Sequence, residues 1–315
     1  MIMASKIKRK TVTIDVIPPY DFSASIHSHR YKKYHCDQYD RANGNYKKAF
    51  ECHGSLILAE IVCEGAVKKP RLSVQLSGTQ LDDENVELVR TQIQQQFLTN
   101  FDIKPFYKQC SHDKIMAALT KRFYGLKPNW PGDLFECLTR CIISQQINVT
   151  FADKVEMNFV QKFGKKLVHG QEIFYVYPDV KTVSEIKKKD LLKIQFSERK
   201  AEYLIDLAQE VIRGTIDLKR LEQLPVKVFR EEITKIRGVG MWTAECCLMH
   251  LGHPEVLPRG DIGLHQAIRR FYGLDKDTKL EKVLKTADGW KGWESFATYY
   301  LWHALTDDRM KNQNK

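Results

Sequence analysis

The chain has 315 residues, 43% of them hydrophobic, so it can build more than one packed unit with a sizeable core. Its 50 Lys and Arg residues outnumber its 39 Asp and Glu residues, which gives a net charge of +11 and a pI near 9.1. This excess favours polyanionic partners, nucleic acid before an anionic membrane, although a basic protein without such a partner fits equally well. No stretch approaches the roughly 20 apolar residues of a membrane span, and the start lacks the apolar segment of a secretory signal.

The eight cysteines predict reduced thiols, most of them in the core of a protein from a reducing compartment. None belongs to a C-x-x-C pair. Cys137 and Cys141 are four residues apart, which places them on one face of a helix. That spacing suits a metal site, but no His or Cys lies nearby in the sequence to complete one.

Strand patterns dominate the first hundred residues. Apolar and polar residues alternate in Thr11–Val16 and in Leu72–Leu76, and Ser55–Val62 is a third candidate strand. The polar segment Arg30–Lys48 predicts a long loop or weak strands. The sequence therefore predicts a small antiparallel sheet at the amino-terminal end.

Helical patterns replace the strands further along the chain. The first predicted helix begins at Asp82 or Asp83, either of which can cap it. From about residue 112 strand signals vanish, and about ten amphipathic segments follow one another. The fold class is therefore expected to be α+β, with a sheet domain in residues 1–112, an all-α region in residues 113–306 and a frayed polar tail in residues 307–315.

The segment Gly238-Val239-Gly240 lies between two helical patterns. Two glycines at this spacing permit a tight turn with positive φ and leave no Cβ in the way. The helix that follows begins with unpaired backbone N–H groups, which can bind a phosphate oxygen. The same pattern also fits a plain corner between two helices.

Asp261 follows a Pro-Arg-Gly segment and starts another helical pattern. This helix is expected to turn Ile262, Leu264 or His265, and Ile268 inward. Asp261 can act as an N-cap worth about 1 kcal/mol, or as a catalytic carboxylate. The local pattern by itself leaves both roles open.

Together these two segments resemble the helix-hairpin-helix (HhH-GPD) DNA glycosylases, in which a catalytic Asp follows a G-V/I-G hairpin after about twenty residues. Here 21 residues separate Gly240 from Asp261. Three more segments resemble helices of that family, namely Phe135–Gln146, Arg199–Ala208 and Trp293–Trp302. Pro18–Ser23, with its sheet, resembles the TBP-like amino-terminal domain of the bacterial 3-methyladenine-DNA glycosylase II (AlkA-like) branch.

The resemblance implies roles for individual residues. Asp261 would be the catalytic carboxylate, and a flipped base would meet Trp242 and Trp302. The residues implied to contact DNA are Gly238, Val239, Gly240 and Thr243 of the hairpin, with Gln146 as the wedge that fills the gap in the base stack. No cofactor is expected to be required. The backbone carbonyls implied to bind a monovalent cation, Na⁺ or K⁺, are those of Thr234, Ile236 and Gly238.

Trp242 separates two classes of this family. Members that also cleave the strand carry a nucleophilic Lys at that position, so the resemblance implies a monofunctional enzyme. No Cys follows Cys247, so no iron–sulfur cluster is expected. The positions that depart from the family pattern are Gln195 for a frequent Gly, Arg237 for the usual Pro, Gly260 for an acidic residue and Glu294 for a frequent Arg.

We therefore expect a monomeric DNA glycosylase of base excision repair, cytoplasmic and nucleoid-associated in a bacterial setting, acting on damaged double-stranded DNA without membrane association. Alkylated purines such as 3-methyladenine and 7-methylguanine are the expected substrates, because their positive charge attracts indole faces and makes the base a good leaving group. Deaminated and etheno bases remain open. The alternatives are a bifunctional glycosylase/lyase for oxidised bases, a non-catalytic helix-hairpin-helix DNA-binding module and a basic structural protein.

Overall fold

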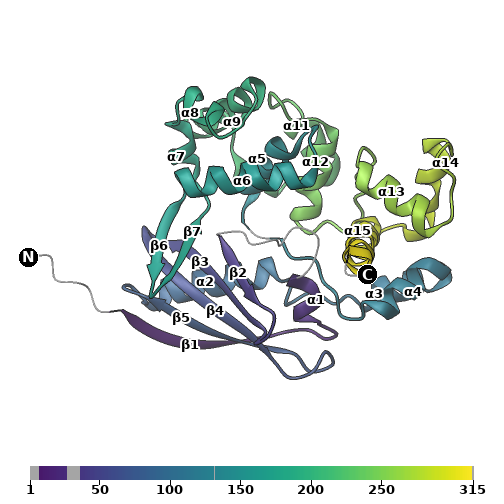
Figure 1. The fold of residues 1–315 in the computed structure, drawn as a ribbon, viewed down its shortest axis with the longest axis horizontal. Helices are drawn as coiled ribbons and strands as arrows, with labels where there is room; N and C mark the ends of the chain where they lie inside the picture. The colour runs from purple at the N-terminus through teal and green to yellow at the C-terminus, as the bar shows by residue number, and fades with distance from the viewer. Residues whose placement is uncertain (1–6, 27–35, 131, 314–315) are drawn as a thin grey trace, which may run out of the picture.

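The computed structural model describes residues 7–26, 36–130 and 132–313, with side chains described as far as residue 308. Figure 1 shows an antiparallel sheet with one group of helices above it and another beside it. The strands run in the order β1-β5-β4-β3-β2. They are β1 (Lys8–Asp15), β2 (Asp37–Asp40), β3 (Asn45–Cys52), β4 (Ser55–Glu64) and β5 (Arg71–Gly78).

The predicted α+β class is confirmed, and the three predicted strands coincide with β1, β4 and β5. The segment predicted as a loop or weak strands forms β2 and the start of β3, while its residues 30–35 lie outside the described part of the chain. Two helices accompany the sheet, α1 (Phe22–Ile26) and α2 (Asp83–Gln96). Asp82 is the N-cap of α2, since its side chain accepts from the Asn85 amide at 2.8 Å.

The helices form two groups, each with its own apolar core. The upper group in Figure 1 consists of α5 (Leu134–Ser144), α6 (Val149–Phe163), α7 (Val180–Ser184), α8 (Lys188–Leu192), α9 (Glu198–Ile212), α10 (Leu218–Glu222), α11 (Val226–Ile233) and α12 (Met241–His250). The lateral group consists of α3 (Lys104–Gln109), α4 (Lys114–Arg122), α13 (Ile262–Phe271), α14 (Leu280–Lys285), α15 (Glu294–Gln313) and two 3-10 turns, η1 (Cys110–His112) and η2 (Thr286–Trp290). No helix in the described ranges is long and apolar enough to cross a membrane.

The expectation of helices alone beyond residue 112 is wrong at one place. Strands β6 (Lys165–His169) and β7 (Glu172–Val176) form a hairpin that reaches from α6 to the sheet (Figure 1). Phe174 of β7 is fully buried against Ala49 of β3 and Leu58 of β4. This contact joins residues more than a hundred positions apart, so the local pattern could not indicate it.

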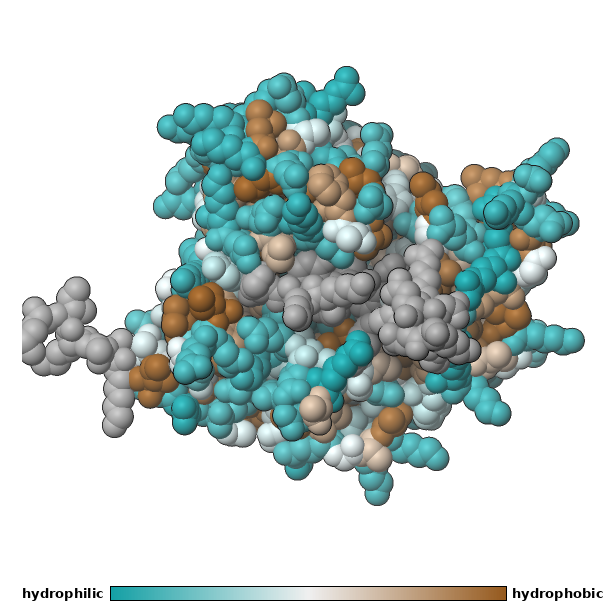
Figure 2. Space-filling model, in the orientation of Figure 1, coloured by the Kyte–Doolittle hydropathy of each residue, from teal (hydrophilic) through white to brown (hydrophobic). Residues whose placement is uncertain are grey.

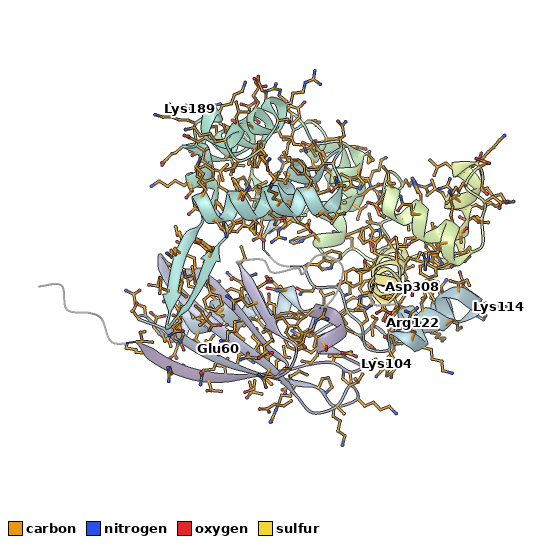
Figure 3. All side chains as sticks on the ribbon, viewed as in Figure 1. Glu60, Lys104, Lys114, Arg122, Lys189 and Asp308 are labelled. Carbon is orange, nitrogen blue, oxygen red and sulfur yellow. The ribbon has the colours of Figure 1, made fainter. Side chains whose placement is uncertain are left out.

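The expectation of a frayed tail from residue 307 is also wrong for the described residues. Helix α15 continues to Gln313, and residues 314–315 lie outside the described range. Arg122 of α4 pairs with Asp307 and with Asp308, the latter at 2.9 Å, and Figure 3 labels Arg122 and Asp308 side by side. These ion pairs between distant segments support the last turns of the helix.

Lys127 connects the sheet to the lateral helices. Its side chain is fully buried, and its ammonium group donates to the backbone carbonyls of Ile17 at 2.9 Å, Leu98 at 3.1 Å and Phe101 at 2.6 Å. All three of its N–H bonds therefore have acceptors. Burial lowers the pKa of Lys127 from 10.5 to about 8.

We expect Lys127→Met to lower the free energy of unfolding by about 2–4 kcal/mol at pH 7, because three buried carbonyls lose their donor. Between pH 8 and 10.5 the folded wild type binds fewer protons than the unfolded chain. The stability advantage of the wild type over Lys127→Met should therefore grow as the pH rises from 7 to 10. Urea unfolding at several pH values measures this, with the exposed Lys104→Met as control. A constant difference would contradict the role given to Lys127.

Candidate active site

Asp261 lies where the two helical groups meet. It is the N-cap of α13 in the lateral group, and its Oδ1 accepts from the Leu264 amide at 2.6 Å. Trp242 comes from α12 and packs on the upper core, whereas Trp302 comes from α15 and packs on both cores. The carboxylate and the two indoles therefore depend on the packing of both groups.

Two tryptophans hold the Asp261 carboxylate from opposite sides of this junction. Trp242 Nε1 donates to Oδ2 at 3.1 Å, and Trp302 Nε1 donates to Oδ1 at 3.1 Å. With the Leu264 amide, three N–H groups fix the orientation of the carboxylate. Oδ1 accepts two of these bonds and Oδ2 accepts one, so Oδ2 retains more acceptor capacity for an additional partner. All three side chains are partly exposed.

The loop that carries Asp261 is held at Arg259, two residues earlier. Glu245 of α12 is buried, and its carboxylate accepts from the Arg259 amide at 3.0 Å. His265 Nε2 lies 2.6 Å from the Arg259 carbonyl oxygen. Burial raises the pKa of Glu245. The sequence analysis missed these contacts, and the only local signal was an acidic residue among the apolar residues of α12.

Gly263 leaves space for the carboxylate. A Cβ at this position would lie 3.1 Å from Asp261 Oδ1 and 3.4 Å from Trp302 Nε1. The carboxylate or the indole would have to move by a few tenths of an ångström to accommodate it. The glycine is therefore explained by the site rather than by its helix, where Gly is unfavourable.

The two hairpin glycines have different physical requirements. Gly238 has φ +86°, and a Cβ there would lie 2.3 Å from the Tyr203 ring. Gly240 has φ −100° and is the N-cap of α12, and a Cβ there would meet no protein atom within 4 Å. The fold therefore requires glycine at position 238, whereas the surface at position 240 is open to a close-approaching partner.

Gln145 braces this hairpin from the end of α5. Its Nε2 donates to the Gly238 carbonyl at 2.8 Å and lies 3.4 Å from Thr243 Oγ1. Thr243 is 1% exposed and Val239 is 6% exposed, so the side chains of these two predicted DNA contacts are buried. Gln146, the predicted wedge, is exposed and has φ +56° in the connection between α5 and α6.

The structure bears on two of the departures from the family pattern. Arg237 pairs with Asp206 at 2.6 Å and with Glu202 at 2.9 Å, which ties the hairpin to α9. Gln195 has φ +73°, a conformation that favours the glycine frequent in the family, and nothing in the structure explains the Gln itself. The expectation that Ile262 faces inward is wrong, since Ile262 is 70% exposed, whereas Leu264 in the same turn of α13 is fully buried.

Residues 139–292 match the model of the HhH-GPD superfamily of base excision DNA repair proteins. The DNA-3-methyladenine glycosylase of Bacillus subtilis is 32% identical over 205 residues, which is 65% of this chain and 68% of that protein. DNA-3-methyladenine glycosylase 2 of Escherichia coli is 26% identical over 63% of this chain and 68% of its own length. The chain therefore belongs to the HhH-GPD superfamily, and within it to the group of DNA glycosylases that contains these two relatives.

Solved structures agree with this fold. The 3-methyladenine DNA-glycosylase of Archaeoglobus fulgidus has a TM-score of 0.80 at 22% identity, over 92% of this chain and 97% of that one. An 8-oxoguanine glycosylase/lyase of Clostridium acetobutylicum has a TM-score of 0.71 at 22% identity, over 94% and 98%. The names of these two neighbours refer to different damaged bases, so the shared fold does not determine which lesion is recognised.

We expect Gly238→Ala to lower the free energy of unfolding by about 3 kcal/mol or more, because the backbone strain and the Tyr203 contact act together. Gly240→Ala should stay within about 1 kcal/mol of the wild type, because only N-cap preference changes. Urea unfolding measures the free energy of unfolding of both variants, which change neighbouring glycines of the same hairpin. Equal losses would contradict the assignment of a structural requirement to Gly238 alone.

Proposed function

We propose that this protein is a monofunctional DNA glycosylase that releases alkylated purines, such as 3-methyladenine and 7-methylguanine, and leaves an abasic site. The observation that carries the proposal is the Asp261 carboxylate, oriented by one backbone and two indole N–H groups at the junction of two helical cores. The names of the Bacillus and Escherichia relatives support the same class of substrate.

DNA is held at the hairpin. The first amides of α12 follow Gly240, which has no side chain to cap them, and a phosphate oxygen can accept from them. Such contacts bind the backbone without reading sequence, and the net charge of +11 adds a salt-dependent attraction. Figure 2 shows a mostly hydrophilic face with apolar residues scattered in small groups, which suits a polar partner.

The damaged nucleotide leaves the duplex and enters the site beside Asp261. Gln146 is the exposed residue nearest in sequence to the Gln145 brace, and it fills the gap left in the base stack. Flipping costs a few kcal/mol and less for a poorly paired base, which favours damaged nucleotides.

The indoles have two tasks in this mechanism. Their N–H groups are engaged by Asp261, so their ring faces are what they can offer to a base. A cationic alkylpurine gains about 0.5–2 kcal/mol from such a face, and a neutral purine gains less. The preference for a charged base therefore arises from the same residues that orient the carboxylate.

Asp261 acts on the sugar. As the glycosidic bond lengthens, positive charge develops on the deoxyribose ring, and a fixed carboxylate stabilises it. Oδ2, with one protein donor, is the oxygen that accepts from the attacking water or faces the sugar. The alkylated base already carries positive charge, so it departs without a second carboxyl group to protonate it.

A monovalent cation at the hairpin is compatible with this arrangement. Backbone carbonyls suit a hard cation. The Ile236 carbonyl accepts from the Val239 amide, and the Gly238 carbonyl accepts from Gln145, so each keeps one lone pair. Together with the Thr234 carbonyl they would hold the ion and stiffen the turn.

The second candidate function is a glycosylase/lyase for oxidised bases, the activity named for the Clostridium neighbour that shares this fold. Lyase chemistry needs an amine nucleophile, and the residue two positions after Gly240 is Trp242, whose N–H is bound to Asp261. Strand breakage without alkali would favour this alternative.

We expect Asp261→Asn to reduce single-turnover release of 3-methyladenine and 7-methylguanine from methylated duplex DNA by about 10²–10³-fold or more. The wild type should leave unbroken strands that alkali cleaves. The Asn carbonyl oxygen can still accept from Leu264 and Trp302, and only the bond from Trp242 is lost. Duplex binding should therefore remain, and Asp288→Asn, an exposed acidic residue on η2, serves as the control. Release that is equally fast in Asp261→Asn would remove the catalytic role of this residue.

The variant Gly263→Ala tests the position of the Asp261 carboxylate separately from the stability of the fold. We expect thermal stability to stay within about 1 kcal/mol of the wild type, because the higher helix propensity of Ala opposes the disturbance of the Asp261 N-cap. Base release should nevertheless fall about tenfold, because the new Cβ displaces the Asp261 carboxylate or Trp302. Unchanged release from a folded variant would show that the orientation of the carboxylate matters less than proposed.

A further inference from the structure

Three buried thiols meet between α5 and α12. The Sγ atoms of Cys137 and Cys247 are 3.7 Å apart, and Cys141 Sγ lies within 4.8 Å of both. None of the three residues is more than 6% exposed. The spacing of Cys137 and Cys141 indicated half of a metal site with no further ligand nearby, and the fold brings Cys247 to it from 110 residues away.

We propose that Cys137, Cys141 and Cys247 form a thiolate site for a soft divalent d¹⁰ cation such as Zn²⁺ or Cd²⁺. With Zn–S bonds of about 2.3 Å, sulfur atoms of one tetrahedral site lie roughly 3.8 Å apart. The 3.7 Å separation already matches this value, so little movement is needed for the Cys137 and Cys247 pair. Sulfur-only donors select zinc-like cations over Mg²⁺ or Ca²⁺.

Cys246 precedes Cys247 on α12 and is only partly buried. It is not part of the group of three sulfurs that lie within 4.8 Å of one another. The three core thiols would therefore bind the cation, and a ligand from outside the group, such as a water molecule, would complete the tetrahedron. The cation replaces the thiol protons, so its uptake should release protons.

The site would support the DNA-binding hairpin. Cys141 precedes Gln145 by four residues on α5, and Cys247 follows Thr243 by four residues on α12. The metal would therefore join the two helices one turn below the contacts of Gln145 with Gly238 and Thr243. Occupancy should raise thermal stability by fixing this pair of helices, independently of the chemistry at Asp261.

The test uses the full-length protein, reduced and freed of metal. Titration with Cd²⁺ should produce the ultraviolet thiolate-to-metal charge-transfer band, saturate at one equivalent and raise the thermal midpoint. Cys247→Ala should lose the band and the midpoint shift, whereas Cys110→Ala, which removes a buried thiol outside the cluster, should retain both. The absence of a band in the wild type, or an unchanged band in Cys247→Ala, would overturn the proposal.

A measurement on the wild type covers the case in which Cys247→Ala does not fold. X-ray absorption of the zinc-loaded protein should give three sulfur neighbours at the zinc ion. Fewer than three sulfurs would overturn the site, and so would a disulfide between Cys137 and Cys247 that persists in reductant and blocks metal uptake. Base release by the same preparations is measured separately, so the proposed glycosylase activity and the proposed metal site can each fail without the other.

Discussion

The site depends on the hydrogen bonds that the indole N–H groups of Trp242 and Trp302 donate to the Asp261 carboxylate. Trp242 belongs to the upper helical core and Trp302 packs on both cores, while Asp261 begins a helix of the lateral group. Their hydrogen bonds form only if the two groups dock in the correct relative position. Any change that shifts one group against the other therefore reaches the carboxylate directly, because a displacement well below 1 Å breaks such a bond.

Other contacts hold the loop of Asp261 and the lateral helices in place. Glu245 and His265 hold the backbone of Arg259 just before Asp261, from α12 and α13 respectively. Lys127 holds the connection between the sheet and the lateral helices through three backbone carbonyls. A buried cation is costly unless every donor is paired, and here all three are. Polar contacts thus define how the sheet and the two helical groups are positioned, whereas apolar packing supplies most of the stability.

The hairpin shows how one motif can combine a folding requirement with a binding surface. Gly238 is dictated by its φ and by Tyr203, whereas Gly240 leaves open space above the start of α12. Gln145 ties this turn to α5, and the proposed thiolate site would tie the same helices one turn lower. Proposed DNA binding and proposed metal binding would therefore act on one structural unit, the pair α5 and α12.

Local order in the sequence was enough to determine the α+β class, the strands β1, β4 and β5 and the cap of α2, since periodicity and capping residues are read from neighbours. The family was indicated by the resemblance of the hairpin, of the Gly240–Asp261 spacing and of three helical segments to known members. Roles for Asp261, Trp242 and Gln146 came from the resemblance and remain predictions. Tertiary structure alone decided the β6–β7 hairpin, the ordered end of α15, the bonds of both indoles to Asp261 and the approach of Cys247 to Cys137. The physical reason is the same in each case: these contacts join residues far apart in the chain, and such pairing depends on how helices and sheet pack rather than on any local pattern.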